Sequence, residues 1–135
     1  MTDNSIKKII FSSDFEEGLV QLSSSQFAVL LDVRFLENNK NFLEKVVKLC
    51  ECGARYFVCY GDQSEVFHDA IDDILICDDD LNDIVTTFHV DESIEEVANF
   101  FMKIVMMNFN YGLVISSDEA SWRIELALLH KSAIG

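Results

Sequence analysis

Residues 27–32 have the sequence Phe-Ala-Val-Leu-Leu-Asp, a continuous apolar run that ends in an acid. Short apolar runs without polar alternation are typical of strands buried on both faces, as in a parallel sheet. The next segment is predicted to be a helix that begins after an N-cap at Asn41 and ends at Gly53. Its apolar residues recur at helical spacing: Phe42, Leu43, Val46, Val47, Leu49 and Cys50. Residues 56–60, Tyr-Phe-Val-Cys-Tyr, then predict a second buried strand. This order predicts two parallel strands connected by a helix.

The same alternation continues toward the C-terminus. From Ser64 onward, one apolar face at helical spacing predicts a helix, and the β-branched residues of 84–88 predict a strand. Ser93 and Glu96 have the spacing of a capping box, which predicts the start of another helix. An apolar strand is then expected at 111–116. Because short connections join these elements, we predict a three-layer α/β fold with a mainly parallel sheet of four to five strands and helices on both faces.

The two ends of the chain are less regular than its middle. Residues 1–26 predict an edge strand near 6–11 and a short helix near 14–22. Residues 121–130 alternate as a strand would, but their strong helix formers favour a helix. The sequence contains no proline, linker or repeat, so residues 1–135 are predicted to form a single α/β domain.

The negative charge is concentrated in the central third of the chain. The sequence has 24 acids against 10 Lys and Arg, a formal net charge of -14. Between Arg55 and Lys103 there are 13 acids and no Lys or Arg, whereas the rest of the chain has 11 acids against 10 bases. Nucleic acids and anionic membranes bind through Lys and Arg, so neither is expected as a partner. A concentrated negative field instead predicts a cationic partner.

The sequence also predicts a compartment. No apolar run approaches the length of a membrane span, and the first residues lack the basic segment of a signal peptide. The four cysteines have neither the spacing of zinc knuckles nor a clear pairing, so we interpret them as structural thiols of a reducing environment. These features predict a cytoplasmic protein.

Candidate binding residues gather after the predicted strands. In parallel α/β sheets, functional groups lie beyond the carboxyl ends of the strands, where this sequence repeatedly places acids. Acids also favour helix N-termini, but capping does not explain those that continue along the solvent side of the helix starting at Ser64. The predicted partner-binding residues are Asp62, Glu65, His68, Asp69, Asp72, Asp73, Asp79, Asp80, His89, Asp91 and Glu92.

A metal site is the alternative interpretation of some of these residues. Glu65, His68 and Asp72 share one helical face, and His89 with its neighbouring acids could complete a ligand set. That helical face lies opposite the apolar stripe, so we expect it to be solvated. The sequence also lacks a glycine-rich phosphate loop and a nucleophile motif. We therefore predict no cofactor, no metal site and no catalytic residues.

Two motifs resemble segments of small, acidic, single-domain bacterial proteins. They are Gly61-Asp62-x-Ser64-Glu65-x-x-His68-Asp69-x-Ile71-Asp72 and Thr86-Thr87-x-His89-x-Asp91-Glu92-Ser93. With its size and localised acidity, the chain resembles immunity proteins of interbacterial toxin systems, such as contact-dependent growth inhibition. The resemblance implies a protein that is not an enzyme. It would neutralise a cognate basic toxin domain, often a nuclease, by covering the active site or the nucleic-acid surface.

Two other functions stay open. His68 and His89 fit a small metal- or carboxylate-dependent enzyme. The helix that follows Ser93 is apolar around most of its circumference, which is typical either of burial or of a homo-oligomeric interface such as a homodimer. The apolar residues concerned are Phe100, Phe101, Met102, Ile104, Val105, Met106 and Met107.

Overall fold

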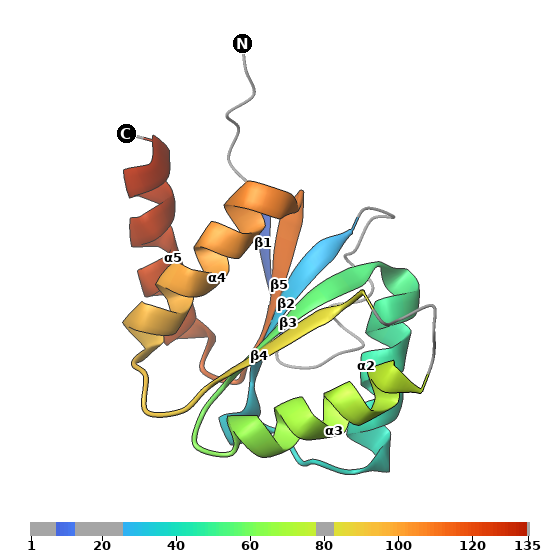
Figure 1. The fold of residues 1–135 in the computed structure, drawn as a ribbon. Helices are drawn as coiled ribbons and strands as arrows, with labels where there is room; N and C mark the ends of the chain where they lie inside the picture. The colour runs from blue at the N-terminus through green and yellow to red at the C-terminus, as the bar shows by residue number, and fades with distance from the viewer. Residues whose placement is uncertain (1–7, 13–25, 78–82, 135) are drawn as a thin grey trace.

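A computed structural model describes residues 8–12, 26–77 and 83–134 (Figure 1). Within these ranges the strands form one parallel sheet in the order β1-β5-β2-β3-β4. The strands are β1 (Lys8–Ser12), β2 (Phe27–Asp32), β3 (Ala54–Tyr60), β4 (Val85–His89) and β5 (Tyr111–Ile115). The predicted parallel sheet is therefore confirmed, with the N-terminal strand at one edge.

Helices cover both faces of this sheet, which confirms the three-layer α/β fold. The helical elements are η1 (Val33–Phe35), α2 (Lys40–Cys52), α3 (Ser64–Ile76), α4 (Ile94–Asn108) and α5 (Glu119–Ile134). Figure 1 shows α2 and α3 on one face of the sheet and α4 and α5 on the other. None of the described helices is long and apolar enough to cross a membrane.

Local sequence signals place most element boundaries. The capping box is confirmed, because Ser93 Oγ accepts from the Glu96 amide and the Glu96 carboxylate accepts from the Ser93 amide. The N-cap predicted at Asn41 is wrong. Asn39 occupies that position and its side chain accepts from the Phe42 amide at 2.9 Å. Both residues are asparagines, and the intervening Lys40 can occupy the first helical turn.

The two ends of the chain differ in how far the predictions can be followed. The alternating pattern in residues 121–130 belongs to α5, so the predicted helix is confirmed there. The N-terminal strand is observed at Lys8–Ser12, close to the predicted 6–11. The short helix predicted near 14–22 lies outside the described residues, and so does the loop predicted around the acids 78–80.

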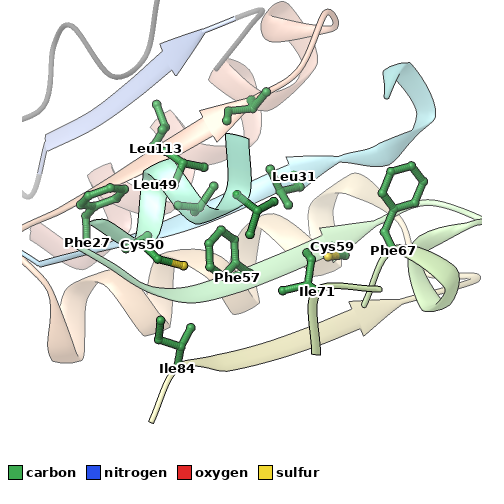
Figure 2. Packing of buried hydrophobic residues seen from close by; sticks show 14 of the residues in the cluster. Phe27, Leu31, Leu49, Cys50, Phe57, Cys59, Phe67, Ile71, Ile84 and Leu113 are labelled. Carbon is green, nitrogen blue, oxygen red and sulfur yellow. The ribbon is translucent and has the colours of Figure 1, made fainter. Parts of the chain in front are cut away.

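Every residue of strand β2 is buried, because the strand lies between the two apolar cores of the domain. Its side chains alternate between the faces of the sheet, as the period of a strand requires. Phe27, Val29 and Leu31 face α2 and α3, whereas Ala28 and Leu30 face α4 and α5. Figure 2 shows the first of these cores, where Phe27 and Leu31 lie among residues from β3, β5 and the covering helices.

The route of the chain creates a switch point beside β2. The chain runs outward from β2 to β3 and β4, and then crosses back through α4 to β5 on the other side of β2. The carboxyl ends of β2 and β5 therefore adjoin the place where the direction of strand addition reverses. In open α/β sheets, ligands bind in the crevice formed at such points.

Helix α4 is apolar mainly because two neighbours bury it. Phe101, Met102 and Val105 are buried in the core between the sheet and α5. Met107, near the end of the helix, is in contrast 77% exposed. Burial against the sheet and α5 therefore accounts for most of the apolar circumference that also suggested an oligomeric interface.

Gly112 on β5 permits the close packing of α4, and this contact gives a test of the core. A Cβ atom at this position would lie 2.8 Å from both Phe101 Cζ and Val105 Cγ2. We expect Gly112→Ala to lower the free energy of unfolding by about 1–3 kcal/mol, because overpacking forces a tight core to shift. Urea denaturation measures this effect, with the exposed Ser117→Ala as the control. Equal stability of the two variants would contradict the observed packing.

Candidate functional site

A buried carboxylate joins the carboxyl ends of β2 and β5 at the switch point. Asp32 is fully buried and accepts hydrogen bonds from the Arg34 guanidinium at 2.8 Å and 2.6 Å. It also accepts from the Ser116 hydroxyl at 2.8 Å and from the Trp122 indole N–H at 2.9 Å. The protein's own side chains therefore meet at the switch point.

These donors keep the buried carboxylate charged. Burial by itself raises the pKa of Asp32, but the hydrogen bonds from Arg34, Trp122 and Ser116 outweigh it and leave the pKa below its usual value of 3.8. The hydrogen bonds to Asp32 in turn raise the pKa of Arg34. Arg34 also lies near the rings of Phe35 and Tyr60 and contacts Asp118 at 3.4 Å. Arg34 is thus held in place as the partner of Asp32.

An open groove of about 590 Å³ lies next to this network, beyond the carboxyl ends of β2, β3 and β4. Acids from the β3–α3 and β4–α4 connections line it together with apolar side chains. The lining residues are Val33, Arg34, Leu36, Tyr60, Gly61, Asp62, Gln63, Phe67, His89, Asp91 and Glu92. The structure thus brings together four of the predicted binding residues: Asp62, His89, Asp91 and Glu92.

The β4–α4 connection fixes its acids with an unusual turn. Asp91 has a φ of 61°, in the left-handed region that Asp adopts more readily than most residues. The neighbouring His89 is buried, and its Nδ1 lies 3.1 Å from the Glu92 carboxylate while its Nε2 lies 3.0 Å from Thr87 Oγ1. Its ring also packs on Phe100 of α4. His89 therefore anchors Glu92 at the groove, and Asp91 is exposed on the rim.

His68 on α3 is less solvated than expected. Its side chain is only 18% exposed and its ring packs on Phe88 of β4. Its two ring nitrogens lie 3.0 Å from Asp69 and 3.4 Å from Asp72. The expectation of a fully solvated helical face is therefore wrong at His68, because the neighbouring strand β4 covers part of this face.

The two histidines lie against opposite faces of the sheet. His68 contacts Phe88 on the face covered by α3, and His89 contacts Phe100 of α4 on the other face. The alternative metal set that combined them is consequently not assembled. Among the described residues, no group of three His, Cys, Asp or Glu side chains is close enough to hold a metal ion.

The remaining predicted acids are distributed along α3 or lie outside the described ranges. Glu65, Asp69 and Asp73 are exposed on α3, and Asp72 is half-buried beside His68. None of these four residues lines the groove. Asp79 and Asp80 lie outside the described residues. The predicted binding residues thus divide into a groove set and an α3 set.

Two of the cysteines are unsuited to nucleophilic chemistry. Cys50 and Cys59 are buried free thiols. Burial raises the pKa of Cys50 to about 11 and that of Cys59 to about 12. Both therefore stay protonated near neutral pH, and they contribute to the core between the sheet and helices α2 and α3.

Sequence reasoning did not identify Ser116 and Trp122 as partners of Asp32. Trp122 lies 90 residues after Asp32, so no local pattern connects the two. A fully buried acid needs several donors, and the single Trp of the sequence was an available one. The apolar segments around both residues were the only signal that they would be buried.

Comparison with known proteins identifies the family. A family model matches residues 15–130, and the chain therefore belongs to the DUF7684 family, described as a domain of unknown function. No curated protein and no solved structure matches the chain at a significant level.

Proposed function

We propose that this member of the DUF7684 family is an immunity protein that binds and neutralises a basic toxin domain. One observation carries the proposal: Asp62, Asp91 and Glu92 gather at one groove within a segment that contains no Lys or Arg. The cation that lines this groove, Arg34, is paired with Asp32. Arg34 therefore does not neutralise Asp62 and Asp91, which would meet the cations of a partner, while Glu92 is held by His89.

The composition of the groove favours a protein side chain as its occupant. Val33, Phe67 and Tyr60 give it apolar walls beside the acids. Low-dielectric walls focus the field of the charges that they border and strengthen the attraction of a cation. An inserted Arg has an apolar stem for these walls and a guanidinium that pairs with carboxylates in a two-pronged geometry.

Binding at this surface explains how a toxin would be neutralised. A nuclease holds the phosphate backbone of its substrate with Lys and Arg side chains. A protein with a net charge of -14 competes for the same side chains and repels the nucleic acid at the same time. Neutralisation in this form requires no catalysis by the immunity protein.

Co-expression tests the proposal. We expect the reading frame directly upstream of this chain to encode a small basic domain, and the probe is that domain, expressed alone or together with the chain. We expect the domain alone to stop growth and the chain to restore it. With purified proteins, the affinity should fall about tenfold or more between about 50 mM and about 200 mM salt, because charge dominates the association. Absence of complex formation at low salt would contradict the proposal.

A further inference from the structure

Strand β4 is the outermost strand on its side of the sheet (yellow in Figure 1). It pairs with β3 on its inner side, where the Gly61 amide donates to the His89 carbonyl at 3.3 Å. Successive residues of a strand direct their backbone groups to opposite sides, so Thr86 and Phe88 direct theirs outward. Within the described part of the chain, no strand pairs with this outer side.

This edge lacks the usual protection against strand addition. Edge strands are normally blunted by Pro, by charged side chains such as Lys, or by bulges. The sequence of β4 is Val-Thr-Thr-Phe-His, and none of these residues is Pro, Lys or an acid. Val85 is 45% exposed and Phe88 is 40% exposed, so apolar surface is accessible on both faces of the strand. The described part of the chain thus shows no proline, charge or bulge on this edge that would oppose an additional strand.

Acids border the open edge on both faces of the sheet. On the α3 face, Phe88 contacts His68, which is paired with Asp69 and Asp72. On the α4 face, His89 is paired with Glu92. No Lys or Arg occurs between residues 56 and 102 to compensate for these charges. The surface around β4 therefore combines negative charge with apolar side chains and with backbone groups that no described strand pairs with.

The charges select the occupant of this edge. A second copy of the chain would bring the same acids against those of the first, and like charges placed across paired strands are destabilising. An extended segment with Lys or Arg at alternate positions would instead direct its cations to one face of the sheet, where Asp69 and Asp72 lie on the α3 side. The basic occupant is therefore favoured over self-association.

We infer that the outer edge of β4 binds a basic extended segment of the partner, which adds a strand to the sheet. Backbone groups of Thr86 and Phe88 would form the ladder, and the flanking acids would select Lys and Arg in the added strand. This inference rests on the proposed function, since it identifies how the basic partner is held. It also gives the acids of α3, which lie outside the groove, a role in binding.

Two peptides of about nine residues distinguish the contribution of backbone pairing to binding from that of charge. One alternates Lys with Val, and the other has the same sequence with N-methyl groups on a run of consecutive central residues. The second peptide keeps every charge but cannot form the ladder. We expect the unmethylated peptide to bind the wild-type chain about tenfold more tightly, and to slow hydrogen exchange at the Thr86 and Phe88 amides.

Thr86→Pro removes one outward N–H and leaves the pairing with β3 intact. The site suits proline because the amide faces away from β3 and because Val85 is already in extended backbone. The buried Thr86 hydroxyl has no hydrogen-bond partner among the described residues, so its loss leaves none of their groups unpaired. Thr86→Val, which keeps the N–H, is the matched control. We expect the proline variant to bind both peptides equally and the valine variant to behave as wild type.

Each other outcome has a defined meaning. If wild type binds both peptides equally and the two amides exchange unchanged, the edge of β4 is not the site, and the charge-based function still stands. If neither peptide binds, the inference about the edge is overturned, while the proposed function at the groove is decided by the co-expression test. If the chain forms a dimer that Thr86→Pro dissociates, the edge is occupied by a second copy and the inference is overturned. Hydrogen exchange at the Thr86 and Phe88 amides is measured on the wild-type chain, so it tests the inference even if a variant does not fold.

Discussion

Replacing Asp32 by Ala is expected to lower the free energy of unfolding by about 3–5 kcal/mol, because it breaks a buried charged network from one side. The substitution would leave the Trp122 N–H and the Ser116 hydroxyl buried without their acceptor, and Arg34 without its closest counterion. Urea denaturation at neutral pH measures the loss. The matched control is Asp73→Ala at an exposed position of α3, where we expect a change below about 0.5 kcal/mol.

The same carboxylate gives the stability a defined pH dependence. The pKa of Asp32 is lower in the folded chain than the usual 3.8. Its contribution to the free energy of unfolding is therefore fully present above pH 3.8. The contribution is lost as the pH falls below 3.8 and through the folded-state pKa. The difference in unfolding free energy between wild type and Asp32→Asn should therefore shrink in this acidic range. A difference that stays constant down to the folded-state pKa would show that the charge of Asp32 does not stabilise the fold.

Reversing Asp62 and Asp91 together, to Lys, is expected to weaken binding of the basic domain by about 2–5 kcal/mol, or roughly 30-fold to several thousand-fold. Both acids line the groove, where a docked Arg or Lys would be desolvated. A single reversal at an exposed position outside the groove should have a much smaller effect, about 0–1 kcal/mol. Titration calorimetry or surface plasmon resonance measures the affinity.

The matched control reverses two exposed acids on α2, Glu44 and Glu51, to Lys. It changes the net charge by the same amount but lies outside the acidic segment, so we expect its effect to be small. Equal losses for the two double variants would show that net charge, rather than the groove, determines the binding.

The fold could be predicted from the sequence because its signals are local. The continuous apolar run of β2 predicts burial on both faces, and all its residues are buried. The capping box at Ser93 and Glu96 depends on residues three positions apart and is present as predicted. The N-cap of α2 was misplaced because Asn39 and Asn41 both satisfy the local preference. The choice between them depends on the path of the preceding chain.

The site was harder to predict because tertiary contacts assemble it. The acids at the ends of β3 and β4 meet at one groove, as the parallel topology predicted. The contact of Trp122 with Asp32 depends on the path that places α5 beside β2, and no local pattern encodes it. Likewise, the packing of His68 on Phe88 follows from the position of β4 next to α3. Helical periodicity alone could not reveal it.

The association rate constant of the basic domain, measured as a function of salt, tests the central proposal most directly. It should be determined for wild type, for the groove variant Asp62→Lys with Asp91→Lys, and for the α2 control. We predict fast, strongly salt-dependent association for wild type and the control, and slower association with a weaker salt dependence for the groove variant. A groove variant that associates as fast as wild type at every salt concentration would contradict the proposal.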